Sequence, residues 1–342
     1  MTKQLPGTSE QELRKFLLEH YAIDAALTRL GSEHDETYRV SLAGADDLIV
    51  KVCALDEPRE FVELQVAVVD HLARSSTVPV PVPVPTPGGA TITRWQHPGG
   101  LPVRLVHVMT CLPGIAVAEQ VLSTEQAERL GTVHGELTAA LAAFRQPAAD
   151  RRIMWDLSLV GELVDTVAAP RSQARVADQV VSHFTRFVRP VAEKGDRQIV
   201  HGDYSVHNVL TDAAAPGFVT GVIDFGDVHA GPVLYDLAIA VSNLLDHRLA
   251  EPWSLASAHV RGFLNVRDIP PVQLRVLAAA AAARCVQRAL ISQWRASTDP
   301  TRADYVHEHS RHDWVRAETA IQTLDTATDQ FLAAAPSDAP TS

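Results

Sequence analysis

Chemically active side chains gather in the stretch HGDYSVHNVL, residues 201–210, and in IDFGD, residues 223–227. Asp203 precedes Asn208 by five positions, and Asp224 follows an apolar pair in the second stretch. Carboxylate and amide oxygens suit Mg²⁺ held beside nucleotide phosphates, and a loop carboxylate can accept the proton of an acceptor hydroxyl. The spacing therefore fits phosphoryl transfer, a reaction that depends on positioning and charge neutralisation rather than on covalent chemistry.

A cation that could offset phosphate charge is Lys51, which lies inside the apolar run LIVKVC. The runs TYRVSL and LIVKVC, separated by the turn-prone AGADD, predict a β-hairpin. TITRW and VRLVHVMTCL predict two further strands, and the Pro-rich segment at 78–89 predicts an extended connector. Apolar spacing predicts a helix in EPREFVELQVAVVDHLA and a shorter one at 8–20. We expect residues 1–112 to form a small antiparallel sheet that carries one helix.

Helical patterns dominate after the break at LPG, residues 112–114. The segment at 123–144 begins with a capping-box pattern, Ser123 with Gln126, and repeats apolar residues on one stripe. Short apolar runs alternate with polar residues between 198 and 225, as expected of short strands and loops. Further helices are predicted at 172–194, 233–247, 271–297 and 313–333. Residues 113–342 should therefore form a mostly helical lobe that carries both motifs.

Composition argues against several other classes of protein. The chain has 342 residues, 46% of them hydrophobic, which is enough for a large core. Its net charge of −11 argues against nucleic-acid binding and suits a small, cationic partner. The widely spaced Cys53, Cys111 and Cys285 predict neither a disulfide framework nor a metal motif. Because no apolar run could cross a bilayer and the N-terminus lacks an apolar targeting region, we expect a cytoplasmic chain without membrane contacts.

The histidines allow a different interpretation of the first motif. His201, Asp203 and His207 could contribute to a transition-metal site, which would favour a metal-dependent hydrolase. A second His-rich stretch, HEHSRH at 307–312, is compatible with the same idea. Positions 307 and 309 do not share a helix face, however, so a solvated surface explains that stretch better.

Together the motifs resemble those of the aminoglycoside phosphotransferase and choline kinase superfamily, the small-molecule branch of the protein-kinase-like fold. They are most similar to hydroxylysine kinase-type proteins. The resemblance implies an α+β, bilobal, protein-kinase-like fold, with a nucleotide-binding lobe at 1–112 and an acceptor site in the lobe at 113–342. It rests on HGDYSVHN at 201–208, GVIDFGD at 221–227, YDLA at 235–238, LIVKV at 48–52 and GSEHDETYRV at 31–40.

The resemblance also implies roles for individual residues in the two motifs. Asp203 would be the catalytic base, Asn208 and Asp224 would bind Mg²⁺, and Lys51 would contact the phosphates of ATP or GTP. His201 would hold the loop structurally. Asp227 could either approach the metal site or support it, and both possibilities stay open.

The remaining implied roles concern the nucleotide and the loop backbone. Glu63, on the helix after the hairpin, would pair with Lys51, and Glu60 is the competing candidate. Ser32 and neighbouring N–H groups would reach the phosphates, although only one glycine stands where protein kinases have several. The base would bind backbone groups around Met109 to Cys111. Asp236 would hydrogen-bond the backbone of the catalytic loop rather than touch a substrate.

The function that these residues imply is a kinase for a hydroxyl of a small, amine-bearing acceptor. Hydroxylysine and short amino alcohols are the first acceptors to consider, aminoglycosides the second, and choline or homoserine follow. Acidic side chains such as Asp304 and Glu308 are candidates for holding the acceptor ammonium. The alternatives are a nucleotide-binding pseudokinase module without turnover and the hydrolase considered above. The sequence leaves the nucleotide preference and the oligomeric state open.

Overall fold

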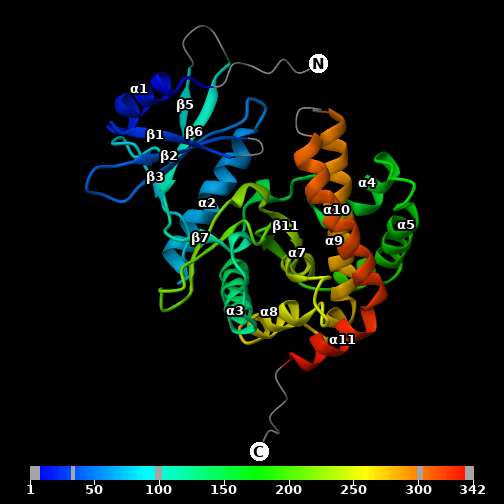
Figure 1. The fold of residues 1–342 in the computed structure, drawn as a ribbon. Helices are drawn as coiled ribbons and strands as arrows, with labels where there is room; N and C mark the ends of the chain where they lie inside the picture. Colours follow the sequence, from blue (N-terminus) through cyan, green and yellow to red (C-terminus); the bar gives the residue numbers. More distant parts are fainter. Residues whose placement is uncertain (1–7, 32–34, 97–101, 299–302, 336–342) are drawn as a thin grey trace, which may run out of the picture. The chain divides into compact units, whose positions relative to one another are not determined.

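The computed structural model describes residues 8–31, 35–96, 102–298 and 303–335, and it excludes the side chains at 298 and 303–311. The chain divides into two compact units. The first comprises Met1–Ser75 and Pro79–Pro113, and the second comprises Ser76–Val78 and Gly114–Ser342. Figure 1 shows strands gathered in the first unit and helices in the second. Across the described ranges, no helix is both long and apolar enough to cross a membrane.

The first unit is built on an antiparallel sheet with the strand order β1-β2-β3-β6-β4, and β5 pairs with β6. The expected hairpin is confirmed as β2 and β3, in which Thr37 faces Lys51. The predicted connector contributes the two-residue strand β4 beside β6. The strands are Ala26–Leu30 (β1), Glu36–Ser41 (β2), Leu48–Val52 (β3), Pro83–Val84 (β4), Thr93–Trp95 (β5) and Arg104–Thr110 (β6).

Alternation along the strands separates the two faces of this sheet. In β3, Leu48, Val50 and Val52 are buried, whereas the side chain of Lys51 projects to the opposite face. The buried face packs against the helix α1, Glu10–Tyr21, which contributes Leu13, Phe16 and Leu17 to the same core. The helices predicted at 8–20 and in EPREFVELQVAVVDHLA are confirmed as α1 and α2 (Arg59–Ser75), so α1 packs on the sheet in addition to the one helix that we expected there.

The second unit is mainly helical and is organised around α9, Pro271–Thr298. The Ala-rich run at 278–283 is buried. Its small side chains allow neighbouring helices to pack closely against α9 on several sides. The predicted capping box of Ser123 and Gln126 is confirmed at the start of α3. The other helices of this unit are α3 (Thr124–Leu141), α4 (Val160–Thr166), α5 (Ala174–His183), α6 (Arg189–Ala192), α7 (Val233–Leu244), α8 (Ser254–Leu264), α10 (Ala303–Gln322) and α11 (Leu324–Ala333).

Two helical predictions need correction, and a further helix was missed. The helix expected at 313–333 is divided at Thr323 into α10 and α11. The helix expected at 172–194 contains a π-helical turn, Phe184–Val188, between α5 and α6. The helix α8 was not predicted, because its small and polar residues show no clear apolar stripe, and its buried surface is defined by its packing against α3.

Short strands of the second unit hold the two motifs. The pair β8 (Arg197–Val200) and β11 (His229–Pro232) is antiparallel, and so is the hairpin of β9 (Val209–Thr211) and β10 (Val219–Val222). A further short strand, β7 (Ile115–Ala116), pairs with β9. The HGD stretch therefore connects β8 to β9, and the DFGD stretch connects β10 to β11.

Candidate active site

The β9–β10 hairpin brings the two motifs together. Val209 pairs with Val222, so the residues just outside the hairpin, Asn208 and Ile223, lie opposite each other. The Ile223 N–H donates to the Asn208 carbonyl oxygen at 2.9 Å. This register places Asp224 one residue beyond the contact with Asn208. Two residues that are 16 positions apart in sequence thus become neighbours through local strand pairing.

Asp203 has hydrogen-bond donors at both of its carboxylate oxygens. Asn208 Nδ2 donates to Asp203 Oδ2 at 2.7 Å and to the Asp203 carbonyl oxygen at 3.0 Å. Arg284, from α9, donates through Nη2 to Asp203 Oδ1 at 3.0 Å. The Ser205 hydroxyl adds a longer contact to Oδ2, at 3.4 Å. The Asp203 side chain is 28% exposed, so it is accessible although these three partners hold its orientation. A carboxylate held in this way can receive a hydrogen bond from an incoming hydroxyl.

The glycine of the HGD motif is required by the packing of its loop. Gly202 has a φ of +80°, a conformation that side chains rarely adopt. A Cβ atom at this position would lie 2.3 Å from the carbonyl oxygen of Asp227. The absence of a side chain therefore lets the HGD loop touch the backbone of the DFGD stretch.

Asp224 has a left-handed backbone conformation, with φ 61° and ψ 76°. For a residue other than glycine, this conformation costs about 1–2 kcal/mol, although Asp tolerates it better than most residues. Backbone strain of this kind is concentrated at functional sites. The Asp224 side chain is exposed to solvent, as a group that binds a ligand requires.

His201 uses both ring nitrogens within the protein. Its Nδ1 accepts the Asp203 N–H at 3.2 Å, and its Nε2 lies 3.1 Å from the Ile223 carbonyl oxygen, to which it donates. Burial lowers the pKa of His201, which keeps the ring neutral. These contacts support the predicted structural role and leave neither nitrogen for a transition metal, which argues against the hydrolase interpretation.

A chain of buried polar side chains supports the HGD loop. Asp236 Oδ1 accepts the Gly202 N–H at 2.8 Å, which confirms the prediction that this carboxylate binds loop backbone. Its Oδ2 lies 3.1 Å from His134 Nε2, and His134 Nδ1 lies 3.2 Å from His259 Nε2. Hydrogen bonds from His134 and Gly202 lower the pKa of Asp236, although burial opposes this shift. Tyr204 stacks on His134 at a centroid distance of 4.1 Å.

The carboxylates of this loop cluster repel one another. Burial raises the pKa of Asp227 to about 7, and the charges of Asp203 and Asp224 add to the effect, while Arg284 and Arg151 oppose it. A bound cation would relieve this repulsion.

The residues present fit a divalent cation that is completed by other oxygens. Because Asn208 Nδ2 donates to Asp203, the amide oxygen of Asn208 is the atom available to a cation, together with the Asp224 carboxylate. Within the described ranges, no three His, Cys, Asp or Glu side chains are grouped closely enough to hold a metal by themselves. Mg²⁺ commonly binds through one or two protein groups, with phosphate and water oxygens as its other ligands.

The first unit carries the residues that we predicted for the nucleotide. Lys51 lies opposite His107 of β6, and burial together with the charge of Lys51 lowers the pKa of His107 to about 3. Glu63 forms an ion pair with Arg59 at 2.7 Å on the exposed surface of α2. The side chain of Glu60 is also exposed. The pairing of either acid with Lys51 therefore remains a prediction.

The segment that we predicted to bind the base lies at the end of β6. Met109 pairs with Ile49 of β3 and Pro83 of β4, and the Cys111 N–H donates to the Asp47 carbonyl oxygen at 2.9 Å. Because the Cys111 N–H is already hydrogen-bonded, we now predict that its carbonyl oxygen binds the base.

Several predicted residues lie outside the described part of the molecule. Ser32 falls in an undescribed segment, and the side chains of Asp304, Glu308 and positions 307–311 are undescribed as well.

Arg284 is the site residue that the sequence patterns missed. It lies in the run AAAAAARCVQRAL and was covered only by the prediction of a helix. A charged residue within a run of small and apolar residues indicates a buried ion pair, which is the signal that could have identified it.

Comparison with known proteins places the motifs within a family. A model described as "Phosphotransferase enzyme family" matches residues 26–274, a range that contains both motifs. Hydroxylysine kinase from Mus musculus is 26% identical over 309 residues, which cover 83% of this chain and 81% of the relative.

Solved structures share the fold of this chain. A microcompartment-associated aminopropanol kinase superposes with a TM-score of 0.74 at 22% identity, over 92% of this chain and 98% of that chain. An amicoumacin kinase in complex with AMP-PNP, Ca²⁺ and Ami gives a TM-score of 0.71 at 15% identity, over 91% and 94% of the two chains. These superpositions confirm the expected kinase-like α+β fold.

Proposed function

This chain belongs to the phosphotransferase enzyme family, and we propose that it transfers the γ-phosphoryl group of ATP or GTP to a hydroxyl of a small, amine-bearing alcohol. The observation that carries the proposal is the Asp203 carboxylate, which is oriented by Asn208 and Arg284 within the loop that adjoins Asp224. The names of two relatives, a hydroxylysine kinase and an aminopropanol kinase, favour hydroxylysine or a short amino alcohol as the acceptor.

Asp203 acts at the acceptor in this proposal. Its carboxylate receives the hydroxyl proton of the acceptor and directs the oxygen towards the γ-phosphorus, while the bond from that phosphorus to the bridging oxygen of the nucleoside diphosphate breaks. The Asn208 donor at Oδ2 and the Arg284 donor at Oδ1 restrict rotation of the carboxylate. Positioning of this kind supplies much of the rate in phosphoryl transfer.

The groups that bind the nucleotide make up the rest of the proposal. The Asn208 amide oxygen and the Asp224 carboxylate would hold a divalent cation, preferably Mg²⁺, which neutralises phosphate charge when it is bound. Lys51 would contact the phosphates, with Glu63 or Glu60 as its acidic partner. The division of the chain into a nucleotide-binding lobe at 1–112 and an acceptor-binding lobe at 113–342 is part of the same proposal.

A panel of acceptors tests the proposed function. The purified chain is incubated with Mg²⁺ and either ATP or GTP, in the presence of hydroxylysine, aminopropanol, choline, homoserine or an aminoglycoside. We expect acceptor-dependent release of nucleoside diphosphate and a phosphorylated amino alcohol or hydroxylysine in the mass spectrum. If only aminoglycosides are phosphorylated, the acceptor is an aminoglycoside rather than hydroxylysine or an amino alcohol. Nucleotide binding without turnover on any acceptor would contradict the proposal and favour a pseudokinase module.

A further inference from the structure

Arg284 places a buried positive charge against the proposed catalytic base. The residue lies on α9 and is 1% exposed. Burying an isolated guanidinium is unfavourable, so a partner of opposite charge is required. That partner is Asp203, whose Oδ1 accepts from Arg284 Nη2 at 3.0 Å. The contact joins residues that are 81 positions apart in the chain.

The guanidinium is held in place by several other contacts. Its Nη1 donates to the Trp155 carbonyl oxygen and to Gln287 Oε1, each at 2.9 Å. Its central carbon lies 4.7 Å from the centroid of the Trp155 ring. Gln287 in turn donates through Nε2 to the carbonyl oxygens of Met154 and Asp156, each at 3.0 Å. The direction of the Nη2 donor towards Asp203 is therefore determined by contacts that do not involve Asp203.

Burying Arg284 also destabilises the fold, so its contribution to stability does not explain why it lies there. Within the described ranges, Arg284 Nε is buried without a hydrogen-bond partner. An unsatisfied buried donor is unfavourable. The residue nevertheless opposes the repulsion among Asp203, Asp224 and Asp227, because its charge lowers the pKa of Asp227.

We propose that Arg284 is a positioning residue that orients the Asp203 carboxylate for phosphoryl transfer. The inference rests on the proposed function, in which Asp203 is the base. Asn208 and the more distant Ser205 hydroxyl hold Oδ2, and Arg284 holds Oδ1, so loss of Arg284 leaves Oδ1 without this donor and lets the carboxylate rotate about its contacts at Oδ2. The chemical step slows, whereas nucleotide binding, which uses other residues, changes little.

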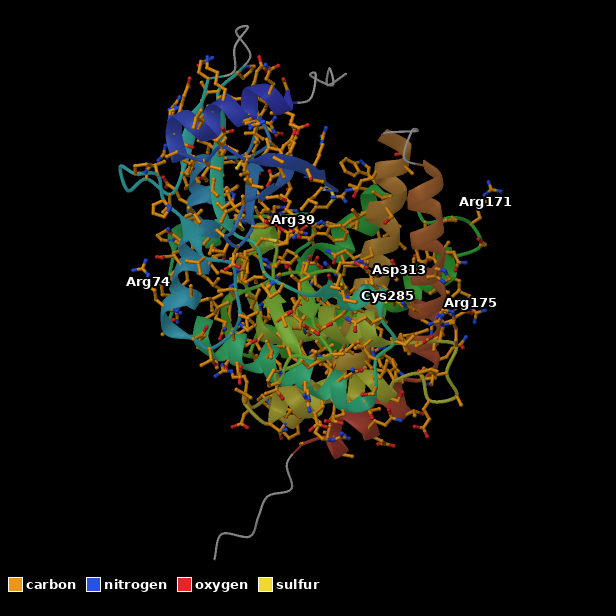
Figure 2. All side chains as sticks on the ribbon, turned by 60° about the vertical axis from the view of Figure 1, so that its left-hand side comes forward. Arg39, Arg74, Arg171, Arg175, Cys285 and Asp313 are labelled. Carbon is orange, nitrogen blue, oxygen red and sulfur yellow. The ribbon has the colours of Figure 1, made fainter. Side chains whose placement is uncertain are left out.

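A matched control lies one turn further along α9. Arg288 is also an arginine with a buried ion pair, and its partner is Asp313 of α10. Figure 2 shows Cys285 and Asp313 close together at the packed pair of α9 and α10. Arg288 donates to Ser242 and Cys285 but makes no direct contact with Asp203 among the described residues. Replacing Arg288, whose side chain is 16% exposed, therefore removes a neighbouring ion-paired charge without removing a donor from the Asp203 carboxylate.

The test compares Arg284→Gln, Arg284→Lys and Arg288→Gln by steady-state kinetics on an acceptor that the wild-type protein phosphorylates. For Arg284→Gln we expect kcat to fall by about 100-fold, with nucleotide KM within about threefold of the wild-type value. Arg284→Lys keeps the charge but not the fork of donors, so its kcat should fall less, by about tenfold. Arg288→Gln should lower Tm yet keep kcat within about threefold. A kcat within threefold of wild type in Arg284→Gln overturns the proposal, as does an equal loss in Arg288→Gln.

A second measurement does not depend on activity. Thermal unfolding of Asp203→Asn, Arg284→Gln and the double variant forms a double-mutant cycle. If the two side chains interact, the decrease in Tm of the double variant should be smaller than the sum of the two single decreases. Additive decreases would show that the pair is not coupled and would refute the proposal. If the wild-type protein phosphorylates no acceptor but the Tm changes are not additive, only the proposed function is refuted.

Discussion

The candidate base is defined by groups that reach it from different parts of the chain. Asn208 is part of the same loop, but Arg284 belongs to a helix far along the sequence. Beneath the loop, His201 accepts the Asp203 N–H, and Asp236 accepts the Gly202 N–H. The backbone and the side chain of Asp203 are thus oriented separately, by buried residues below and by polar donors at the carboxylate.

Asp203→Asn tests the base at the scale of one residue. The amide has nearly the same shape but cannot accept the hydroxyl proton, so we expect kcat to fall by about 10²–10⁴-fold. Nucleotide affinity should stay within about threefold, because the side chain acts on the acceptor. Titration with a fluorescent nucleotide analogue and steady-state kinetics would measure the two quantities. A variant with full activity would show that Asp203 is not the base.

The helices α3 and α8 position the histidines that support the loop. His134 of α3 and His259 of α8 meet under the loop, with nitrogens 3.2 Å apart. This contact requires the helix backbones to approach closely. The approach is possible because Gly262 has no side chain: a Cβ atom there would lie 1.8 Å from the Glu128 carbonyl oxygen. The glycine therefore sets the helix spacing on which the buried polar chain depends.

Gly262→Ala should force the two helices apart. We expect it to lower the free energy of unfolding by about 1–3 kcal/mol, as overpacking does in other cores, and to reduce kcat through the displaced histidines. Gly161→Ala in α4 is the control, because a Cβ there would meet only Arg189 Nη2, at 3.7 Å. The control should leave stability unchanged or raise it by about 0.5–1 kcal/mol. Equal denaturation midpoints for the two variants would contradict the conclusion that Gly262 sets the spacing between α3 and α8.

Across the whole molecule, several histidines are buried as neutral rings. Burial lowers the pKa of His107 to about 3, and it lowers the pKa of His201, His229 and His259 as well. In the unfolded chain each of these rings takes up a proton near pH 6.5, whereas the folded protein excludes that proton until lower pH. Asp227 acts in the opposite direction, because its pKa is raised to about 7 in the folded protein.

Together these groups predict that the protein becomes less stable when the pH is lowered from 7 to 5. Between pH 7 and pH 5, the unfolded chain binds more protons than the folded one, so the free energy of unfolding should fall as the pH is lowered. Each histidine contributes at most about 1.4 kcal/mol per pH unit in this range. Urea denaturation at pH 7, 6 and 5 would measure the decrease, and His107→Phe should make it shallower. Constant stability across this range would show that folding does not lower the pKa of these histidines.

The local features of this protein could be predicted from sequence because each depends on residues near one another in the chain. Alternation revealed the β2–β3 hairpin, and the Ser123–Gln126 pair predicted the start of α3. The two polar motifs indicated a phosphoryl-transfer site. They lie at the two ends of the short β9–β10 hairpin, so local strand pairing is enough to bring them together. The superfamily resemblance added the fold, and comparison with known structures confirmed it.

Other features depend on contacts between distant segments, which no local pattern encodes. The residues of α8 are buried by packing against α3, α7 and α11. The helix α1 shares its core with buried side chains of strands that follow it in the sequence. The resemblance implies Glu63 or Glu60 as the partner of Lys51, and that pairing stays a prediction, while Glu63 forms an ion pair with Arg59.

The sequence by itself thus indicated a phosphoryl-transfer site in the HGD and DFGD stretches, and its resemblance to a family supplied the fold class. The tertiary structure alone decided which distant charge meets the HGD loop. Arg284 gains its significance from helix packing that places its donor 3.0 Å from Asp203, and packing depends on the shapes of many side chains together.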